Sequence, residues 1–329
     1  MITEKIVIPE SIHAYTATGE PVPEVPRKNP LREGQCPNCE TWISTTAKGK
    51  TKCKKCETKV DVSGWYVNGL RETTTKDMKE YGLFPSISRL CSYGEMPIEL
   101  SNWYKTRLVK HVMACYDLDP AKWMLRVNQG LSALENEYSD RGTQIHAWIQ
   151  QFMEGQPAKD MDATGIRCCR EIKEWEQSLG ITGATREYSH CDPELGMGGT
   201  IDFASSSPRI IADYKTKHSK DTFEAIKKGS KAPLWSVTKQ LAGYEAISMK
   251  ADYADASYAV FVRVEDDHPD TGETLPVLIG VDDLIDGRLA IVANANAWFK
   301  NQRFDPRNMF SRNECWTLNE ILQGSRNDE

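Results

Sequence analysis

Two short segments that each carry an aspartate constrain the fold of this 329-residue chain more than any other feature. Gly199–Phe203 reads Gly-Thr-Ile-Asp-Phe, and Ile210–Lys215 reads Ile-Ile-Ala-Asp-Tyr-Lys. Both are typical of neighbouring strands, and because side chains alternate along a strand, Asp213 and Lys215 share a face. A buried acid and amine at a strand end are costly unless a cation or a phosphate compensates their charge. A site for a hard divalent cation with a lysine beside it meets this requirement, and a solvated salt bridge is the alternative.

Four further polar residues flank these segments. His146 lies at the edge of an apolar helical stripe, where a histidine is most often simply packed. Glu187 lies on an expected strand that precedes the first acidic segment. Gln240 and Tyr244 lie one turn apart on one face of an expected helix. Each residue alone has a plain structural explanation, so only their combination bears on function.

The order and spacing of these residues resemble those of the PD-(D/E)XK nuclease superfamily. A helical histidine, a strand glutamate, G-x-x-D, D-x-K and Q-x-x-x-Y follow one another as in its RecB-type exonuclease branch. Phage exonucleases and the mitochondrial genome maintenance exonuclease belong to that branch. A second match lies upstream, where Phe84–Leu90, Met96–Pro97 and Leu100–Lys105 are similar to a segment of the mitochondrial and phage single-strand exonucleases. Together the matches cover roughly residues 84–300.

The resemblance implies an α/β fold, with a three-layer α/β/α restriction-endonuclease-like core and an extra helical layer. It also implies a catalytic set, which comprises His146, Glu187, Asp202, Asp213, Lys215, Gln240 and Tyr244. One or two Mg²⁺ or Mn²⁺ ions would be held by His146, Asp202, Asp213 and the backbone carbonyl of Tyr214. Lys215 would orient or deprotonate the attacking water, whereas Glu187 would serve a second ion or position a water. Gln240 and Tyr244 would brace the site or touch the substrate.

A separate pattern near the N-terminus predicts a structural zinc site. Cys36, Cys39, Cys53 and Cys56 form two C-x-x-C turns with thirteen residues between them. Each turn can present two thiolates to one tetrahedral zinc, and Thr41–Lys52 is long enough for a hairpin. A ribbon of about thirty residues has too small a core to fold alone, so zinc binding would supply its folding free energy. A redox dithiol is the alternative, although no βαβ pattern surrounds these cysteines.

The zinc ribbon is also the most basic part of the chain. Nine Lys or Arg against three Asp or Glu lie between Arg27 and Lys59, whereas the whole chain has a formal net charge of −6. The remainder of the chain is therefore strongly acidic. A local surplus of positive charge suits contact with nucleic-acid phosphates. A solubilising surface or a docking site for a protein partner is the alternative.

The pattern of cysteines and the hydropathy of the chain indicate in which cellular compartment the protein is expected. The ten cysteines do not resemble a secreted disulfide framework, and two of them are adjacent within a helical pattern. No apolar run of eighteen residues and no secretory segment is visible, so we expect no membrane partner and a cytoplasmic location, in the bacterial host if the chain is phage-encoded. Some RecB-type nucleases carry an iron–sulfur cluster, but only one cysteine follows the Gln240 helix here, so that cluster is not expected. The cysteines outside the ribbon are expected to be small buried hydrophobes, and they are Cys91, Cys115, Cys168, Cys169, Cys191 and Cys315.

Composition and hydrophobic periodicity divide the chain into four parts. Residues 1–30 are expected to be extended, 31–65 to form the zinc ribbon, 66–310 the nuclease domain, and 311–329 a peripheral tail. Helices are expected at residues 98–116, 132–155, 163–180, 221–228, 234–250 and 283–300. Strands are expected within 184–215 and at 257–264 and 275–281.

These expectations lead to a function. The leading prediction is a metal-dependent DNA exonuclease that hydrolyses phosphodiester bonds, prefers single-stranded ends and acts, with a protein partner, in phage replication, recombination or repair. The preference would come from a helical passage lined by Trp103, Tyr104, Lys105, Arg107, Lys110 and His111, unless the aromatic pair simply packs among the helices. An endonuclease of the same fold, of the restriction or CRISPR-adaptation type, and a non-catalytic zinc-ribbon DNA-binding protein are the alternatives. RNA as the substrate also stays open.

Overall fold

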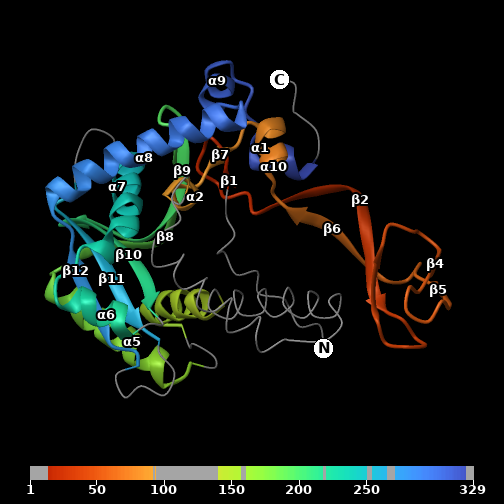
Figure 1. Cartoon of the computed structure of the whole chain (residues 1–329), viewed down its shortest axis with the longest axis horizontal. Helices are drawn as coiled ribbons and strands as arrows, with labels where there is room; N and C mark the ends of the chain where they lie inside the picture. Colours follow the sequence, from red (N-terminus) through yellow and green to blue (C-terminus); the bar gives the residue numbers. More distant parts are fainter. Residues whose placement is uncertain are drawn as a thin grey trace, which may run out of the picture.

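The protein combines a central β-sheet, covered by helices on both faces, with an elongated β-rich arm built from N-terminal residues (Figure 1). The computed structural model describes residues 14–91, 93, 140–156, 161–217, 220–249, 254–264 and 271–323. None of the helices in these ranges has both the length and the apolar character needed to traverse a lipid bilayer.

Five strands form the central sheet in the order β12–β11–β10–β9–β8. Their bounds are Thr182–Asp192 for β8, Met197–Ser207 for β9, Arg209–Lys217 for β10, Ala256–Arg263 for β11 and Thr274–Leu278 for β12. β8, β9 and β10 follow one another through short turns and run antiparallel, whereas β10 and β11 are parallel. A parallel pair needs a long crossover. The crossover here consists of α6 (Lys220–Lys227), the short helix η2 (Ala232–Leu234) and α7 (Trp235–Met249).

Alternating side chains give the sheet two buried faces. The helices that cover them, besides α7, are α2 (Ile87–Cys91), α5 (Ala163–Ser178), α8 (Val281–Gln302) and the helical residues 140–153. On one face Ile211 lies in a core with α2, α7 and α8. On the other face Ala212 lies in a core with residues 140–153 and α5. The sheet therefore lies between two helical layers, and the predicted three-layer α/β arrangement is confirmed.

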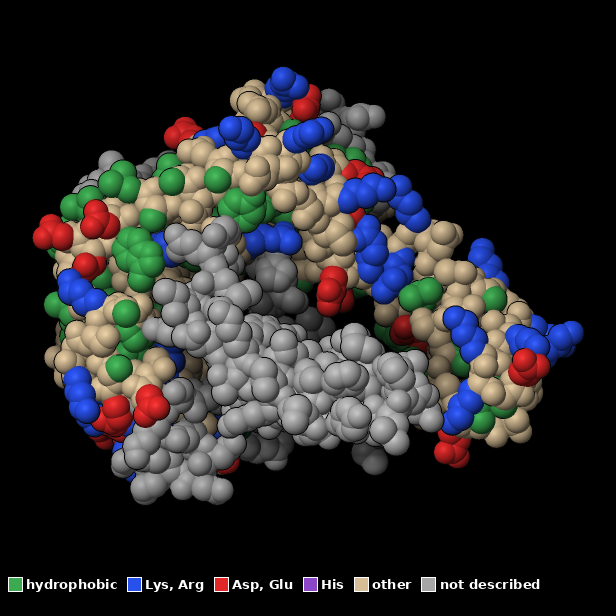
Figure 2. Space-filling model, viewed as in Figure 1, with side chains coloured by type: hydrophobic (Ala, Val, Ile, Leu, Met, Phe, Trp, Pro, Cys, Tyr) green, Lys and Arg blue, Asp and Glu red, His purple; other side chains and the backbone are tan. Residues whose placement is uncertain are grey.

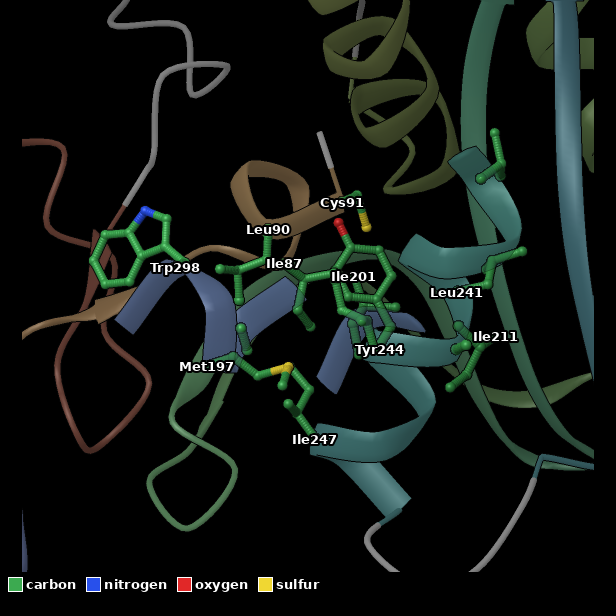
Figure 3. Close-up of a cluster of buried hydrophobic side chains, with 14 of the residues drawn as sticks. Ile87, Leu90, Cys91, Met197, Ile201, Ile211, Leu241, Tyr244, Ile247 and Trp298 are labelled. Atoms are coloured by element: carbon green, nitrogen blue, oxygen red, sulfur yellow. The ribbon is translucent and has the colours of Figure 1, made fainter. Parts of the chain in front are cut away.

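Two glycines let α7 approach the sheet and α2 closely. A Cβ at Gly199 of β9 would meet the Tyr244 ring at 2.7 Å, and one at Gly243 of α7 would meet Ile87 at 2.8 Å. Figure 3 shows Ile87 and Tyr244 in this shared core. The close packing fixes Tyr244, and with it Gln240 one turn earlier, against the sheet.

The predicted elements match the structure closely where it describes them. α5, α6, α7 and α8 differ from their predicted ranges by no more than two residues at either end. β12 ends three residues before its predicted end, because Gly280 has extended dihedrals and forms the N-cap of α8. The predicted helix at 98–116 and residues 132–139 of the next one lie outside the described residues, so the extra helical layer stays a prediction. The same holds for the predicted passage, whose residues are Trp103, Tyr104, Lys105, Arg107, Lys110 and His111.

The arm is a long antiparallel strand pair that carries a small ribbon at its tip (Figure 1). Its strands are β2 (Glu24–Gln35), β3 (Trp42–Thr45), β4 (Lys50–Lys52), β5 (Lys59–Asp61) and β6 (Tyr66–Glu72). β2 pairs with both β3 and β6, and β4 pairs with β5. The predicted hairpin within Thr41–Lys52 is therefore wrong. Each C-x-x-C turn reverses the chain by itself, so β3 folds back on β2, and β4 leads into β5. The domain limits 31–65 stay a prediction, and the paired strands of the arm extend beyond them on both sides.

Elements from the first and last described parts of the chain pack beside the central sheet. The elements there are β1 (Ala14–Tyr15), β7 (Phe84–Pro85), α1 (Thr75–Tyr81), α9 (Pro306–Ser311) and α10 (Leu318–Gln323). β1 pairs with β7, and α1 begins at a capping box between Thr74 and Asp77. The Trp316 ring lies 5.0 Å from that of Tyr81, and Ile321 is fully buried. The described part of the predicted C-terminal tail is therefore docked.

Candidate active site

One pocket of about 290 Å³ gathers most of the residues singled out in the sequence. Its lining includes His146, Glu187, Asp202, Tyr214, Lys215, Gln240 and Tyr244. Asp213 lies next to the pocket, fully buried, with a carboxylate oxygen 2.8 Å from Lys215 Nζ. Side chains from the helical residues 140–153, from three strands and from α7 thus meet at one place on the sheet.

Asp202 lies where β9 and β10 separate. The ladder between the two strands ends with Ala212 opposite Phe203. Beyond it the backbone N–H of Tyr214 donates a hydrogen bond of 2.6 Å to Asp202 Oδ2. The carboxylate thereby accepts from a backbone N–H that would be unpaired where β9 and β10 separate. Its other oxygen, Oδ1, faces His146.

Glu187 lies opposite Asp202 at an irregular point of the β8–β9 ladder, whose bridged pairs omit these two residues. Glu187 has a φ of 49°, a left-handed conformation that costs about 1–3 kcal/mol for a residue other than glycine. At the same point the alternation of β9 reverses, because Ile201 and Phe203 pack on opposite faces of the sheet. The reversal brings Glu187 and Asp202 to the same pocket.

His146, Glu187 and Asp202 form a compact cluster of candidate metal ligands. Their ligand atoms all lie within 4.8 Å of one another. His146 Nδ1 lies 3.7 Å from Asp202 Oδ1 and 3.9 Å from Glu187 Oε1. The other ring nitrogen, Nε2, lies 3.0 Å from the backbone oxygen of Tyr214. The buried side chain of Ile145 anchors this helix on the sheet, so the histidine at its edge reaches the cluster.

Asp213 and Lys215 lie on the same face of β10, as the alternation predicts. Lys215 Nζ is 2.8 Å from Asp213 Oδ2. Among the described residues, however, neither oxygen of this carboxylate has a partner with hydrogen-bond geometry. Lys215 thus compensates the charge on the Oδ2 side only, and the buried Oδ1 has no partner in the described part of the chain, which is unfavourable by itself. It is the arrangement expected where a cation completes the site.

Burial and neighbouring charges shift the pKa values of these groups. Burial raises the pKa of Asp213 to about 6, although Lys215 opposes the shift. Burial also raises the pKa of Asp202, against the opposing effect of His146. For His146 burial acts to lower the pKa, but the Asp202 and Glu187 carboxylates outweigh it and raise the pKa to about 9. Without a cation the cluster therefore retains protons that a bound cation would displace.

The donor set fits a hard divalent cation. Carboxylate and carbonyl oxygens are the ligands that Mg²⁺ and Mn²⁺ prefer, and one imidazole is compatible with them. His146 Nε2 lies at hydrogen-bond distance, 3.0 Å, from the Tyr214 oxygen, and Nδ1 faces the carboxylates of Asp202 and Glu187, so the imidazole could supply one nitrogen ligand on the carboxylate side. The residues that could hold such an ion are His146, Asp202, Asp213 and, through its carbonyl, Tyr214.

Gln240 and Tyr244 form the wall of the pocket on the α7 side. Gln240 Nε2 donates hydrogen bonds to the Tyr244 hydroxyl at 2.6 Å and to Ser88 Oγ at 3.2 Å. Ser88 belongs to α2 and lines the pocket, so the Phe84–Leu90 segment singled out in the sequence lies at the site. Both α7 side chains are buried, and their hydrogen bonds run to each other rather than to the acidic cluster. This geometry suits a bracing role.

Tyr15 is a site residue that sequence reasoning missed. It lines the pocket from β1, and its hydroxyl forms a hydrogen bond of 3.1 Å with Thr200 Oγ1. Burial raises its pKa to about 12. Tyr15 lies in a segment that was expected only to be extended. The one available signal was Gly198, where a Cβ would meet the Tyr15 ring at 2.8 Å.

Glu176 of α5 is a second residue that the sequence analysis did not identify, and it supports the site through contacts with Tyr214 and Arg186. It accepts a hydrogen bond of 3.3 Å from the Tyr214 hydroxyl and forms an ion pair with Arg186. Burial raises the pKa of Glu176, and Arg186 opposes that shift. This buried network holds the residue whose carbonyl faces His146. Nothing in the sequence distinguishes Glu176 from the other acids of its helix.

The four cysteines Cys36, Cys39, Cys53 and Cys56 converge at the tip of the arm, as predicted. Their Sγ atoms lie within 4.8 Å of one another, with 3.6 Å between Cys36 and Cys56 and between Cys39 and Cys53. Such separations fit a tetrahedral zinc with Zn–S bonds of about 2.3 Å. A hydrogen bond with the Thr58 hydroxyl is the main cause that lowers the pKa of Cys56 to about 5, whereas burial raises the pKa of Cys36 to about 11. The cluster could therefore hold a zinc ion.

The remaining described cysteines are free thiols, and Cys91, Cys168, Cys169 and Cys191 are buried as expected. Cys315 is only partly buried. Cys115 lies outside the described residues.

Comparisons with known proteins add little to this geometry. No protein-family model matches the chain. No curated protein matches it either. Among solved structures, a phage-related exonuclease from Haemophilus somnus 129PT is 17% identical, with a TM-score of 0.27, over 52% of this chain and 83% of that one.

Two further solved structures are of an exonuclease called LHK-Exo. The one in complex with dAMP is 14% identical, with a TM-score of 0.34, over 70% of this chain and 93% of that one. The other, described as an alkaline exonuclease from Laribacter hongkongensis, is 16% identical, with a TM-score of 0.30, over 65% and 97%. Likenesses at these TM-scores carry no argument about function, which has to rest on the site itself.

Proposed function

We propose that the chain is a divalent-metal-dependent deoxyribonuclease that hydrolyses phosphodiester bonds. The observation that supports this proposal most directly is one pocket in which carboxylates, a histidine and a lysine from separate elements meet. Acids gathered in a buried site destabilise one another, and a cation together with a phosphate substrate compensates this cost. No other cluster of this kind lies in the described part of the chain, apart from the four cysteines.

In this proposal one Mg²⁺ or Mn²⁺ is held by His146, Asp202, Asp213 and the Tyr214 carbonyl. Glu187, at the edge of the same cluster, takes a second ion or positions a water. A bound cation would supply Lewis-acid polarisation of a phosphate oxygen and lower the pKa of a bound water. The strained backbone of Glu187 supports a functional position, because such strain persists mainly where the site requires it.

Lys215 acts on the substrate by its charge. Burial acts to lower its pKa, but Asp213 and Asp202 outweigh burial and raise it. The lysine therefore stays protonated near neutral pH, which favours orientation of the attacking water and neutralisation of phosphate charge over proton abstraction. Asp213 holds the ammonium group in place at 2.8 Å.

We further propose that the substrate is DNA with a free, single-stranded end, and that the enzyme acts in replication, recombination or repair. The support is the sequence resemblance to single-strand exonucleases, together with the position of Ser88 at the pocket. The zinc ribbon is an accessory module in this proposal. A cytoplasmic location and a phage origin follow from the same resemblance and remain part of the proposal.

The test is digestion of end-labelled single-stranded and double-stranded DNA with Mg²⁺, with Mn²⁺ and with a chelator. We expect progressive shortening of the single strand from one end, abolished by the chelator, and no cleavage of a circular single strand. Cleavage of the circle would replace the exonuclease by an endonuclease of the same fold. Cleavage of a matched RNA alone would correct the substrate, and no cleavage of any nucleic acid would refute the proposal.

A further inference from the structure

The sheet of the arm exposes two aromatic side chains on one face. Trp42 of β3 and Tyr66 of β6 are 63% and 73% exposed. Trp42 pairs with Gln35, and Tyr66 pairs with Glu33, two residues earlier on β2. Because cross-strand neighbours share a face, as do residues two apart on one strand, both rings stand on the same side of the sheet.

Packing within the arm does not account for these two rings. The small core of the arm consists of the cysteine cluster with Val60, Val62 and their neighbours, and Trp65 packs against it. Gly34 lies so close to the Trp65 ring that a Cβ there would be 2.7 Å from it. Trp65 is thus the tryptophan that the fold uses, whereas Trp42 points to solvent. A pair of large exposed rings on one face is typical of an interaction surface.

The tip of the arm also carries positive charge, much of it on β4, on β5 and in the second cysteine turn. Its exposed lysines are Lys48, Lys50, Lys52, Lys54, Lys55 and Lys59. Lys52 forms an ion pair with Glu57, but Lys54 and Lys55, inside the second cysteine turn, have no acidic partner among the described residues. Figure 2 shows Lys and Arg side chains gathered over the arm on the face in view. The rest of the chain is acidic overall, so this charge is local.

Glu33, which lies on β2 between the two rings, is hydrogen-bonded to residues on both neighbouring strands. Glu33 accepts hydrogen bonds from Ser44 Oγ at 3.0 Å and from Asn68 Nδ2 at 3.4 Å. The face between the rings therefore favours the flat surface of a base over a phosphate, and phosphates are attracted to the lysines at the tip instead. Proteins that bind single-stranded nucleic acid without sequence preference stack its bases on aromatic side chains and hold its phosphates with basic side chains. A duplex hides the faces of its bases and fits this surface less well.

We infer that the arm is a second nucleic-acid site, which binds single-stranded DNA through Trp42 and Tyr66 and through the lysines at its tip. The choice of DNA over RNA rests on the proposed function. The arm would hold the substrate while the candidate active site shortens it. Lys54 and Lys55 would contact phosphates, and the two rings would each stack on a base.

The test measures binding in the Asp213→Ala background, by anisotropy of a labelled oligothymidine of about 30 nucleotides. Combined Trp42→Ala and Tyr66→Ala changes should raise Kd by about tenfold or more, equivalent to about 1.4 kcal/mol. A Trp42→Phe change alone keeps an aromatic face and should retain most of the affinity for the oligothymidine. Phe310→Ala removes a ring that is 43% exposed on α9 and serves as the matched control.

Salt dependence separates the lysines from the rings. Combined Lys54→Ala and Lys55→Ala changes should reduce the slope of log K against log salt by about 0.7 for each phosphate that the two lysines neutralise. Lys300→Ala, at an exposed position near the end of α8, should leave the slope unchanged. The aromatic variant should weaken binding with little change of slope.

Unchanged affinity in the double aromatic variant would overturn the inference and point to a protein partner for this face. Equal loss in Phe310→Ala, or equal loss for duplex DNA, would overturn it as well. Its failure is distinct from that of the proposed function. A protein that cuts DNA but binds it independently of the arm refutes only the arm site, whereas binding that depends on Trp42 without any cleavage refutes only the nuclease.

Discussion

The two clusters of candidate metal ligands in this chain are built in opposite ways. The cysteine cluster takes its ligands from two similar turns of one ribbon, whose own core contains few apolar side chains. The cluster of His146, Glu187 and Asp202 takes its ligands from a helix and separate strands that two large cores hold in place. In the ribbon zinc binding should stabilise the fold, whereas in the pocket the packing of the fold positions the candidate metal ligands. Substitutions in each cluster test this difference between the two sites.

The largest effect is expected from loss of the cysteine cluster. Combined Cys36→Ser and Cys39→Ser changes should abolish zinc binding and unfold the tip of the arm, because structural zinc supplies about 10–16 kcal/mol to modules of this size. Zinc content and hydrogen exchange measure the result. Exchange in β3, β4 and β5 should become fast, while β9, β10 and β11 stay protected.

Cys315→Ser is the matched control, since this cysteine is far from the cluster in sequence and only partly buried. It should leave both the zinc content and the exchange of the arm unchanged. If the arm of the zinc-free double variant stays protected from hydrogen exchange, the ribbon folds without metal, and the proposed difference between the two clusters is wrong.

The next effect concerns the pocket. Asp213→Ala should lower cleavage by at least about a thousandfold, because it removes a proposed metal ligand and the partner of Lys215 together. The fold and the zinc content should persist, since the pocket is formed by packing. Asp286→Ala, an exposed acid on α8, is the control and should cleave normally. Normal cleavage by Asp213→Ala would refute the assignment of the site.

Stability should respond to Asp213 in the opposite direction from activity. Burial raises the pKa of Asp213 from 3.8 to about 6, so the stabilising effect of its protonated form is complete below pH 3.8 and is lost as the pH rises through 6. The side chain in Asp213→Asn is neutral at every pH, so this variant keeps the stabilising effect of a neutral group at position 213. At pH 8, without Mg²⁺ or Mn²⁺, it should raise the free energy of unfolding by about 2–3 kcal/mol.

Urea denaturation followed by tryptophan fluorescence measures this difference. The advantage of Asp213→Asn over the parent should shrink as the pH falls toward 4, and Mg²⁺ should stabilise the parent alone. A variant less stable than the parent at pH 8 would mean that the Lys215 pair outweighs the cost of burying the charge.

The smallest effect is expected from Tyr15→Phe. The change removes a hydrogen bond of 3.1 Å but keeps the ring that packs on Gly198. One such bond contributes about 0.5–1.5 kcal/mol to stability, so the free energy of unfolding should fall by about that amount and cleavage by about threefold or less. Thr200 keeps its bond of 2.8 Å with Ser189, which limits the disturbance. A hundredfold loss would instead place the Tyr15 hydroxyl among the groups that act on the substrate.

Sequence patterns predicted well what short-range geometry decides. The D-x-K spacing places Asp213 and Lys215 on one face of any strand, and a C-x-x-C turn brings its two thiolates together in any ribbon. The pairing of strands in the arm was predicted wrongly, because spacing alone does not tell which strand a turn returns to. Contributions from distant segments carried no local pattern, and Tyr15 and Glu176 were missed for that reason.

The position of Glu187 shows the same limit. Its residue type and order in the chain were readable, but its left-handed backbone and the reversal of β9 arise only when β8 and β9 pair. The sequence could therefore nominate this glutamate without indicating how it reaches the pocket.

The most direct test of the central claim is anomalous diffraction from a crystal grown with Mn²⁺. We expect a Mn²⁺ peak bounded by His146, Asp202, Asp213 and the Tyr214 carbonyl, and its loss in Asp213→Ala. A fully occupied Mn²⁺ elsewhere, with none in this pocket, would contradict it.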